Sequence, residues 1–305
     1  AKGDRQTGSV DTMKLVAGVD SSTQSCKVVI RELETGRVVR NGSAKHPDGT
    51  EIDPERWWEA LNQAISAAGG IDDVEAISIA AQQHGMVALD AQGEVIRPAL
   101  LWNDTRSADQ ANDIIAKFGG QGIADLTGSL PVASFTATKL LWLKQNEPEN
   151  AARVAAVCLP HDWLTWRLAG YGPAAESILG PDLSALTTDA SDASGTGYFN
   201  PKTGEYVNEV LEFVLGHLPT VPKIIQANQA AHTFTSASGN EIKIGAGAGD
   251  NAAAAFGVLA KAGDVVVSLG TSGTVFAVSA TATNDSTGTI AGFASASNDF
   301  LPLVC

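Results

Sequence analysis

Glycine and hydroxyl residues occur twice in this chain as a short run between two apolar segments. The first run is GVDSSTQS, residues 18–25, and the second is SLGTSG, residues 268–273. Small residues let a backbone approach phosphate closely, and consecutive N–H groups in such a turn form a concavity that binds anions. One such run is weak evidence, because turns of this composition between strands are common. Two runs of one design, the first with Asp20 at the end of its strand, predict two lobes that hold one nucleotide.

The two runs supply candidate contacts for phosphate groups. Hydroxyl groups and closely approached backbone amides can both donate to phosphate oxygens. The candidates are Ser22, Thr23, Gly270, Thr271 and Ser272. Asp20 ends the first predicted strand, where its carboxylate could orient Mg²⁺ or the waters around it. The alternative for Asp20 is a turn-forming aspartate that accepts from its own backbone.

Asp250 is the candidate general base. Transfer of a phosphoryl group to a hydroxyl needs a carboxylate that accepts the hydroxyl proton. Asp250 lies where a glycine-rich turn meets the start of a predicted helix. The alternative is an N-cap for the helix that begins at Asn251, a position that aspartate fills well. The two roles are compatible, so both stay open.

Polar side chains also follow the apolar strand predicted over residues 74–80. Gln83 and His84 lie in the loop after this strand, which is a normal location for ligand contacts. A glutamine amide donates and accepts, and a neutral histidine offers one donor and one acceptor, so the pair suits vicinal hydroxyls of a sugar. A histidine in a loop is more often an ordinary surface residue, and that alternative stays open.

The segment 102–106 follows another predicted strand end. Trp102, Asn103 and Asp104 are candidate sugar contacts, with the indole packed on an apolar face of the sugar. Trp102 follows an apolar run, so the core is its alternative location. Asp104 has its own alternatives, which are a pair with Arg106 or a cap on the helix that follows.

Three consecutive strands open the chain, and helices and strands then alternate. Period-two apolar patterns predict strands, and apolar residues three and four apart predict helices. The strands are expected at 14–19, 26–33, 37–44, 74–80 and 154–159, and helices from Asp53–Pro54 and at 136–146, 161–168 and 208–215. This order predicts an α/β fold with a mixed sheet flanked by helices.

A second unit is predicted to begin near Glu241, with a strand at 242–246 and a helix at 251–259 before the hairpin 264–278. We therefore expect a flexible leader over residues 1–12, a first domain over 13–240 and the beginning of a second domain over 241–305. Because each domain contains a phosphate-type hairpin, two related lobes with a cleft between them are expected.

Composition narrows the range of functions. The 305 residues carry 20 basic and 34 acidic side chains, a formal charge of −14, which argues against binding to nucleic acid or to an anionic membrane. No apolar stretch approaches the roughly 18–20 residues that span a bilayer, and residues 1–12 are too polar for a secretory signal. Cys26, Cys158 and Cys305 lack metal-type spacing and predict reduced thiols in a cytoplasmic protein.

Taken together, six stretches resemble the sugar kinases of the FGGY family in sequence and order. The stretches are 16–20, 82–85, 102–106, 191–196, 249–251 and 268–273. Gly-Asp-Asn followed by Ser-Leu-Gly-Thr-Ser-Gly is specific for the family. The Gln-x-His-Gly loop together with Trp-Asn-Asp-x-Arg resembles the members that act on xylulose rather than on glycerol, gluconate or ribulose. The first loop departs from the family, since Asp-Ser-Ser-Thr-Gln-Ser stands where many relatives have Asp-Leu-Gly-Thr-Ser.

The resemblance implies a ribonuclease-H-like fold of the actin/hexokinase/Hsp70 ATPase superfamily, with two lobes that close on ATP and Mg²⁺. It implies phosphorylation of D-xylulose to D-xylulose 5-phosphate, with Asp250 as base and Asp20 at the metal. The implied sugar contacts are Gln83, His84, Trp102, Asn103, Asp104, Asp250 and Asn251. Because family members extend beyond residue 305, residues 241–305 are expected to form an incomplete start of the ATP-binding domain.

Three alternatives were weighed against this function. Another ketose such as L-ribulose could be the substrate, and the chain as given could be a catalytically silent sugar-binding lobe. An NAD-dependent dehydrogenase is excluded, because the glycine pattern at 245–249 does not have the dinucleotide spacing. The expected partners are a small ketose and ATP, and a homodimer stays open.

Overall fold

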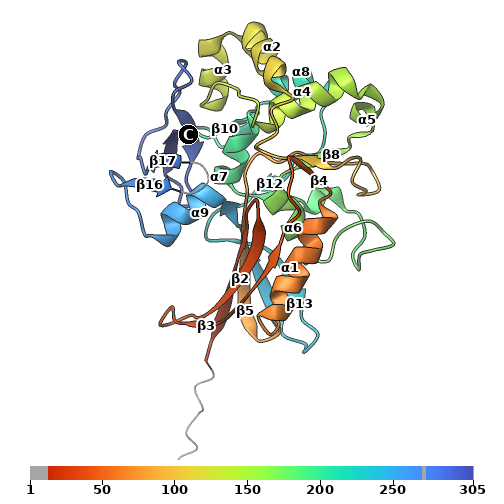
Figure 1. Ribbon diagram of the computed structural model, residues 1–305, viewed down its shortest axis with the longest axis vertical. Helices are drawn as coiled ribbons and strands as arrows, with labels where there is room; N and C mark the ends of the chain where they lie inside the picture. The colour runs from red at the N-terminus through yellow and green to blue at the C-terminus, as the bar shows by residue number, and fades with distance from the viewer. Residues whose placement is uncertain (1–12, 270–272, 305) are drawn as a thin grey trace, which may run out of the picture.

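A large mixed sheet forms the lower half of the molecule in the computed structural model, which describes residues 13–269 and 273–304 (Figure 1). Its strand order is β13-β14-β5-β1-β2-β3, and β15 also pairs with β5. The strands are β1 (Leu15–Ser21), β2 (Ser25–Glu32), β3 (Val38–Lys45), β5 (Val74–Ala81), β13 (Ala230–Thr235), β14 (Glu241–Gly245) and β15 (Ala248–Gly249). The predicted mixed sheet is thereby confirmed.

Alternating burial places the sheet against helix α1 (Glu55–Ala67). Every second residue of β1 is buried, and α1 turns Trp57, Ala60, Leu61 and Ala64 toward the same core. Gly42 of β3 lies so close to α1 that a Cβ there would stand 2.3 Å from the carbonyl oxygen of Ala64. The helix predicted from Asp53–Pro54 therefore covers the sheet as its apolar stripe requires.

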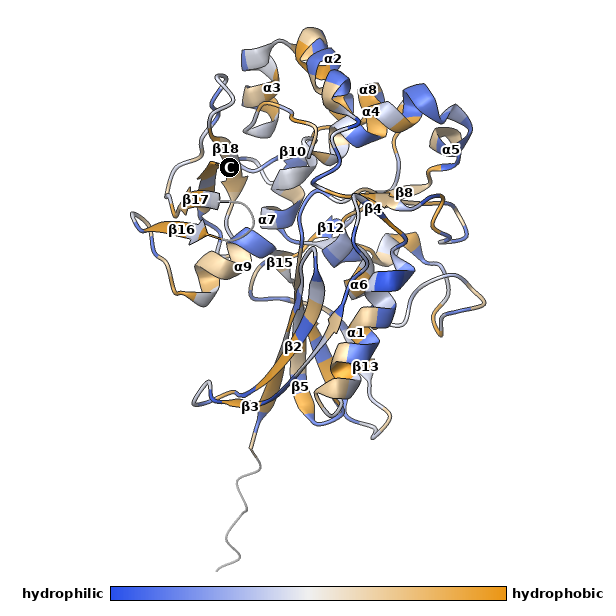
Figure 2. Ribbon diagram, viewed as in Figure 1, coloured by the Kyte–Doolittle hydropathy of each residue, from blue (hydrophilic) through white to orange (hydrophobic). Residues whose placement is uncertain are grey.

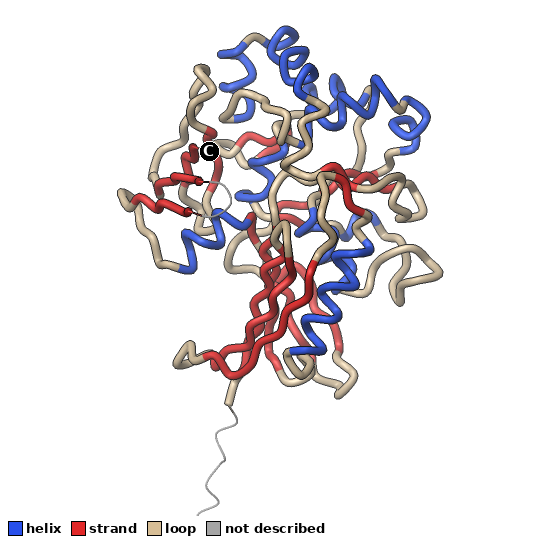
Figure 3. The backbone as a smooth tube through the Cα atoms, in the orientation of Figure 1, coloured by secondary structure: helices blue, strands red, loops and turns tan. Residues whose placement is uncertain are grey.

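A helical layer surrounds a second core in the upper part of the molecule (Figure 3). Its helices are α2 (Ala108–Phe118), α3 (Gly120–Thr127), α4 (Thr136–Asn146), α5 (Pro148–Arg153) and α8 (Asn208–Leu215), with α6 (Pro160–Leu168) packed against β5 of the large sheet. Helices α4 and α8 have the bounds that the sequence predicts. Helices α3 and α5 were not predicted, because each is short and carries few apolar residues.

Short paired segments connect these layers. They are β4 (Glu51–Ile52) with β7 (Ala99–Leu100), β6 (Val87–Leu89) with β8 (Ala156–Cys158), β9 (Thr187–Thr188) with β12 (Lys223–Ile224), β10 (Phe199–Asn200) with β11 (Glu205–Tyr206), and the single turns η1 (Leu183–Ala185), α7 (Ala190–Ala193) and η2 (Ser194–Thr196). These connections thus consist of elements two to four residues long.

A second sheet follows helix α9 (Asp250–Gly257). Its order is β16-β17-β19-β18, with β16 (Val265–Leu269), β17 (Gly273–Ala277), β18 (Ala291–Ala294) and β19 (Phe300–Val304). The predicted hairpin of β16 and β17 is confirmed. Apolar side chains of β16 lie largely exposed, with Val265 at 62% and Leu269 at 85%, and colour the strand orange in Figure 2.

The boundary predicted between residues 240 and 241 falls inside a hairpin of the large sheet. Strand β14 pairs antiparallel with β13 and parallel with β5, and β15 pairs with β5 as well. A boundary at 240 would separate two strands that share a ladder, so the first unit extends through β15. The predicted leader, residues 1–12, lies outside the described residues. Within the described ranges, no helix has the length and apolar character needed to cross a membrane.

Candidate functional site

The carboxyl ends of three neighbouring parallel strands form one edge of the large sheet. In the ladder Ser21 of β1 pairs with Ala81 of β5, and Ala81 pairs with Gly249 of β15. Each strand is followed by candidate residues: the tip of the β1–β2 hairpin, the loop 82–85, and the first turn of α9. Ligands bind at such edges in open α/β sheets, because the loops that leave parallel strands converge there.

Asp250 is the first residue of α9, and Gly249 occupies the N-cap position. Its Oδ1 accepts hydrogen bonds from the backbone N–H of Asn251 at 2.8 Å and from the side-chain amide of Asn251 at 3.3 Å. Burial raises the pKa of Asp250 to about 6, and the negative charge of Asp20 adds to the rise. A carboxylate with this pKa is ionised near neutral pH and still basic enough to accept a proton.

Asp20 lies across the same edge at the end of β1. Its side chain is 48% exposed, and the ammonium of Lys27, its partner in the hairpin, is 3.9 Å from Oδ2. An exposed carboxylate with such a loose ion pair can ligate Mg²⁺, which prefers carboxylate oxygens and retains several waters. Asp20 thus offers a carboxylate of the kind that Mg²⁺ prefers, at the edge where the sequence predicts a magnesium ion.

His84 is held in one orientation beside this edge. Its backbone has a φ of +70°, and its Nδ1 lies 2.7 Å from the carbonyl oxygen of Gly195. Because a carbonyl only accepts, Nδ1 donates and Nε2 carries a lone pair. Burial lowers the pKa of His84 to about 4, with the ammonium of Lys139 adding to the effect, and the ring stacks on Phe135 at 5.1 Å. His84 is thus a neutral, oriented hydrogen-bond acceptor.

Gln83 lies in the loop after β5, as the sequence predicts, and its side-chain amide makes contacts within the protein. The side chain is buried, its Nε2 donates to the carbonyl oxygen of Ser191 at 3.2 Å, and its Oε1 accepts from Asn251 Nδ2 at 3.3 Å. Asn251 Oδ1 in turn accepts from Thr274 of β17 at 3.4 Å. Gln83 and Asn251 therefore connect the loop, the helix of Asp250 and the second hairpin, and their sugar contacts stay predictions.

The segment 102–106 divides into an exposed and a buried part. Trp102 is 37% exposed, and its indole N–H donates to Thr23 Oγ1 at 2.8 Å. Asp104 is buried and accepts from Arg106 at both oxygens, each at 2.9 Å, and from Thr50 at 2.9 Å. Burial would raise the pKa of Asp104, but these donors outweigh it and lower the pKa below its usual value.

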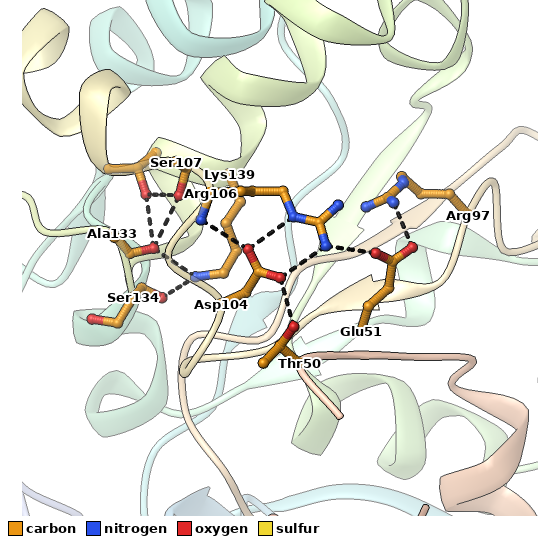
Figure 4. A network of polar contacts seen from close by, with 10 residues as sticks. Thr50, Glu51, Arg97, Asp104, Arg106, Ser107, Ala133, Ser134 and Lys139 are labelled. Atoms are coloured by element: carbon orange, nitrogen blue, oxygen red, sulfur yellow. Dashed lines mark hydrogen bonds and ion pairs between the residues drawn. The ribbon is translucent and has the colours of Figure 1, made fainter. Parts of the chain in front are cut away.

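Figure 4 shows that the Asp104 network continues away from the site through Arg106 and Glu51 to Arg97. The structure therefore favours the pairing with Arg106 over a sugar contact for Asp104. Asn103 is partly buried, and its Nδ2 lies at 3.5 Å from the carbonyl oxygen of Gly49, at the limit of a hydrogen bond.

The predicted phosphate contacts are only partly visible. The tip of the first hairpin is fastened by His46, whose Nδ1 lies 2.8 Å from the carbonyl oxygen of Ser22, and by Trp102 on Thr23. Both loop residues therefore lie at the edge with Asp20. Three further candidates, Gly270, Thr271 and Ser272, lie outside the described residues.

The sequence did not single out the buried polar residues beneath this edge. In the described part of the chain, His161, Asp162 and Asp192 have donor atoms within 4.8 Å of one another and are fully buried. This spacing suits a metal ion or a protonated imidazole between two carboxylates. Asp192 belongs to the stretch 191–196, so the family resemblance marked the segment, but no local pattern connects it to His161.

Two cavities lie elsewhere. One of about 340 Å³ is lined by Arg97, Trp163 and Arg167, and another of about 620 Å³ lies between α3 and the segment 280–284. The residues that line them include none of the candidate site residues. The chemistry of the edge therefore depends on the strand ends rather than on either cavity.

Comparison with known proteins agrees with this geometry. The family model described as "FGGY family of carbohydrate kinases, N-terminal domain" matches residues 15–257. A xylulose kinase of Streptomyces coelicolor is 47% identical over 301 residues, covering 95% of this chain and 60% of that protein. The chain therefore spans less than two thirds of the length of this relative.

Solved structures show the same similarity. The crystal structure of xylulose kinase from Bifidobacterium adolescentis superposes with a TM-score of 0.92 at 45% identity, over 96% of this chain and 64% of that one. The structure of Plasmodium falciparum glycerol kinase with ADP superposes with a TM-score of 0.81 at 21% identity, over 96% of this chain and 61% of that one, which shows the fold alone.

Proposed function

Because the chain belongs to the FGGY family of carbohydrate kinases, we propose that its protein transfers the terminal phosphoryl group of ATP to D-xylulose, giving D-xylulose 5-phosphate. The observation that carries the proposal is Asp250, a carboxylate with a pKa of about 6 at the edge where three parallel strands end. The two xylulose kinases at 45–47% identity support the choice of sugar.

In this reaction Asp250 accepts the proton of the C5 hydroxyl while the hydroxyl oxygen attacks the terminal phosphorus of ATP. The P–O bond to the bridging oxygen breaks, ADP leaves, and the proton stays on the carboxylate until it passes to solvent. Oδ1 of Asp250 accepts from the backbone and the side chain of Asn251, so Oδ2 would be the oxygen that accepts the sugar proton. Positioning and charge stabilisation supply the remainder of the rate.

The phosphates of ATP would lie against the tips of the two hairpins. Asp20 would hold Mg²⁺, which when bound neutralises charge on the phosphate oxygens. Ser22 and Thr23 would donate from one tip, and Gly270, Thr271 and Ser272 from the other. Small residues at both tips let backbone amides approach these oxygens.

The sugar would lie between His84 and Trp102. The Nε2 lone pair of His84 accepts from a sugar hydroxyl, and its low pKa keeps the ring neutral while it does so. The exposed face of Trp102 offers an apolar surface to the C–H face of the ketose. Asn103, at the rim of the same loop, would add a polar contact.

The test is the turnover of the whole protein with ATP and a panel of pentuloses. We expect D-xylulose to be the best substrate and Asp250→Asn to lower kcat by about 10³-fold, which is the scale of general base catalysis. Sugar binding measured by calorimetry should survive the substitution. The matched control is Asp264→Asn, because the carboxylate of Asp264 accepts from the backbone N–H of Lys261 in an exposed turn.

Near-normal turnover of Asp250→Asn would refute the role of this carboxylate. Higher turnover with L-ribulose would move the proposal to another ketose kinase, and sugar binding without any transfer in the whole protein would favour a silent binding lobe. A cytoplasmic location, a homodimer and the lack of nucleic-acid binding stay predictions.

A further inference from the structure

The segment 246–250, which ends in Asp250, is held from below by the single-turn helix α7. Ser191 of α7 accepts a hydrogen bond at its Oγ from the backbone N–H of Gly249 at 3.2 Å. Its carbonyl oxygen accepts from Gln83 at 3.2 Å, and Gln83 in turn holds Asn251. One serine therefore contacts the residue before Asp250 and, through Gln83, the residue after it.

The other end of the segment 246–250 is held by His161 of α6. The Nε2 of His161 lies 2.9 Å from the carbonyl oxygen of Ala246 and, facing an acceptor, must carry a proton. Gly247 follows with a φ of +75°, and a Cβ there would lie 2.0 Å from His161 Nε2. The chain thus turns directly against the imidazole, and only glycine allows so close an approach.

The second nitrogen of the ring is held by Asp192 and lies close to the carboxylate of Asp162. His161 Nδ1 lies 3.2 Å from Asp192 Oδ2 and 3.3 Å from Asp162 Oδ1, and all three side chains are buried. Burial opposes the imidazolium, but the two carboxylates outweigh burial and raise the pKa of His161 well above 6.5. Both ring nitrogens therefore donate, and the ring has one orientation.

The carboxylates are fixed in their turn. Asp162 Oδ2 accepts from the backbone N–H of Leu159 at 2.7 Å, and Asp189 caps α7 by accepting from the N–H groups of Ser191 and Asp192 at 3.0 Å. A buried ion group of this kind is weak evidence for stability, because desolvation offsets the attraction. A role in holding a geometry explains it better than a role in net stability.

We propose that His161 and Asp192 are positioning residues for Asp250. With Ser191 they fix both ends of the segment 246–250 and so set the direction in which α9 presents the carboxylate. The inference rests on the proposed function, in which Asp250 accepts the sugar proton. It assigns to the stretch 191–196 a task that the phosphoryl transfer itself leaves unassigned.

The test compares His161→Ala, Asp192→Ala, Asp192→Asn and Ser191→Ala in the whole protein with D-xylulose and ATP. We expect both alanine variants of the ion group to lower kcat by about 10–100-fold, the scale of a misplacement near 1 Å, with KM for sugar and ATP within about twofold. Asp192→Asn should keep most of the kcat, because the amide oxygen can still accept from Nδ1 of the ring. Ser191→Ala should fall between them.

The matched control is His217→Gln. His217 makes the same kind of contact, with Nε2 at 2.8 Å from the carbonyl oxygen of Val154, but holds a different segment. Hydrogen exchange of the peptide that contains 246–257 adds a readout that needs no activity. It should speed up in His161→Ala and stay unchanged in His217→Gln.

The outcomes separate the two proposals. If the wild type and His217→Gln phosphorylate no pentulose, the proposed function fails, while hydrogen exchange still shows whether His161 holds the segment. If kcat per folded molecule and exchange of 246–257 stay unchanged in His161→Ala, the positioning role is overturned. A lower melting temperature with normal kcat would overturn it too, since that is the result of a purely structural residue.

Discussion

Asp250 and Asp104 are carboxylates within two polar networks of the same molecule, and the fold treats their charges in opposite ways. Asp104 receives both arms of Arg106 and the hydroxyl of Thr50, and its pKa is lowered. Among the described residues, Asp250 receives amide donors from Asn251 on one oxygen, and burial raises its pKa to about 6.

This difference in pKa separates a carboxylate that supports the structure, Asp104, from one that is suited to proton transfer, Asp250. A carboxylate that is saturated with charged donors is a poor base, because protonation would break its ion pair. A carboxylate left without a cation in a partly buried place gains basicity at the expense of stability. The network of Asp104 therefore fixes the loop that carries Trp102. Within the described part of the chain, the donors that reach Asp250 all contact Oδ1.

The largest effect is expected for substitution of Asp250, the carboxylate suited to proton transfer. Asp250→Asn should lower kcat by about 10³-fold without lowering the melting temperature at pH 7.5. The pKa of Asp250 in the folded state lies above the ordinary aspartate value of 3.8, so the ionised side chain opposes folding increasingly as pH rises from about 4 through 6. Asparagine removes that penalty and keeps the shape. A melting temperature several degrees lower would show that Asp250 is a structural residue.

The second effect is a loss of stability on substitution of Asp104. Asp104→Asn should destabilise the protein by about 2 kcal/mol, because the charged donor Arg106 loses its partner at a buried carboxylate. Denaturant unfolding measures the change. The control is Asp73→Asn, an aspartate that also pairs with an arginine, Arg40, but is 55% exposed, where a loss of about 0–1 kcal/mol is expected. Equal losses at the two sites would contradict the difference drawn here.

Sequence reasoning predicted the elements whose pattern is local. The alternation in 14–19 and 26–33 and the stripes of 136–146 and 208–215 carry their own periodicity, so β1, β2, α4 and α8 could be predicted from their own residues. The partner of a strand is not encoded in the strand itself. Residues 241–245 therefore suggested a new domain, although they pair with β5, some 165 residues earlier in the chain.

The dependence on distant partners also explains why the roles of the candidate site residues could not be assigned from sequence. Asp104 and Asp250 both follow apolar runs near a glycine or a polar loop, and sequence alone cannot tell them apart. What distinguishes them is Thr50, 54 residues before Asp104, and Glu51, 55 residues before Arg106. His161 and Asp192, 31 residues apart, were missed for the same reason. Motif resemblance located the residues at this edge of the large sheet. Their individual roles depend on contacts that only the three-dimensional structure shows.

A third effect sharpens the comparison through pH. Because Asp250 must be ionised to accept a proton, kcat should fall roughly tenfold per pH unit below its pKa of about 6. The terminal phosphate of ATP titrates in a similar range, so the profile of one protein is ambiguous. Asp20→Asn resolves this, because the charge of Asp20 contributes to the raised pKa of Asp250. In that variant the acidic limb of the pH profile should move to lower pH. If the limb does not move, the titrating group is the phosphate of ATP.

The smallest effect is expected at Trp102 and tests whether this residue supports the first hairpin or contacts the sugar. Trp102 belongs to the same segment as Asp104, yet its indole N–H donates to Thr23 at the edge of the sheet. Trp102→Phe keeps an aromatic face and removes that donor, so we expect a loss of about 1 kcal/mol or less in stability and a sugar KM within about twofold. Trp102→Ala removes the face as well and should raise the sugar KM further, at similar kcat.

Unequal behaviour of the two variants is what assigns Trp102 to the sugar, since both lose the hydrogen bond to Thr23 and only alanine loses the ring. If phenylalanine and alanine raise the sugar KM alike, the hydrogen bond alone matters, and Trp102 acts as a fastening for the first hairpin in the way that His46 does. In that case Trp102 supports the hairpin tip, and His84 remains the candidate sugar contact with an oriented acceptor.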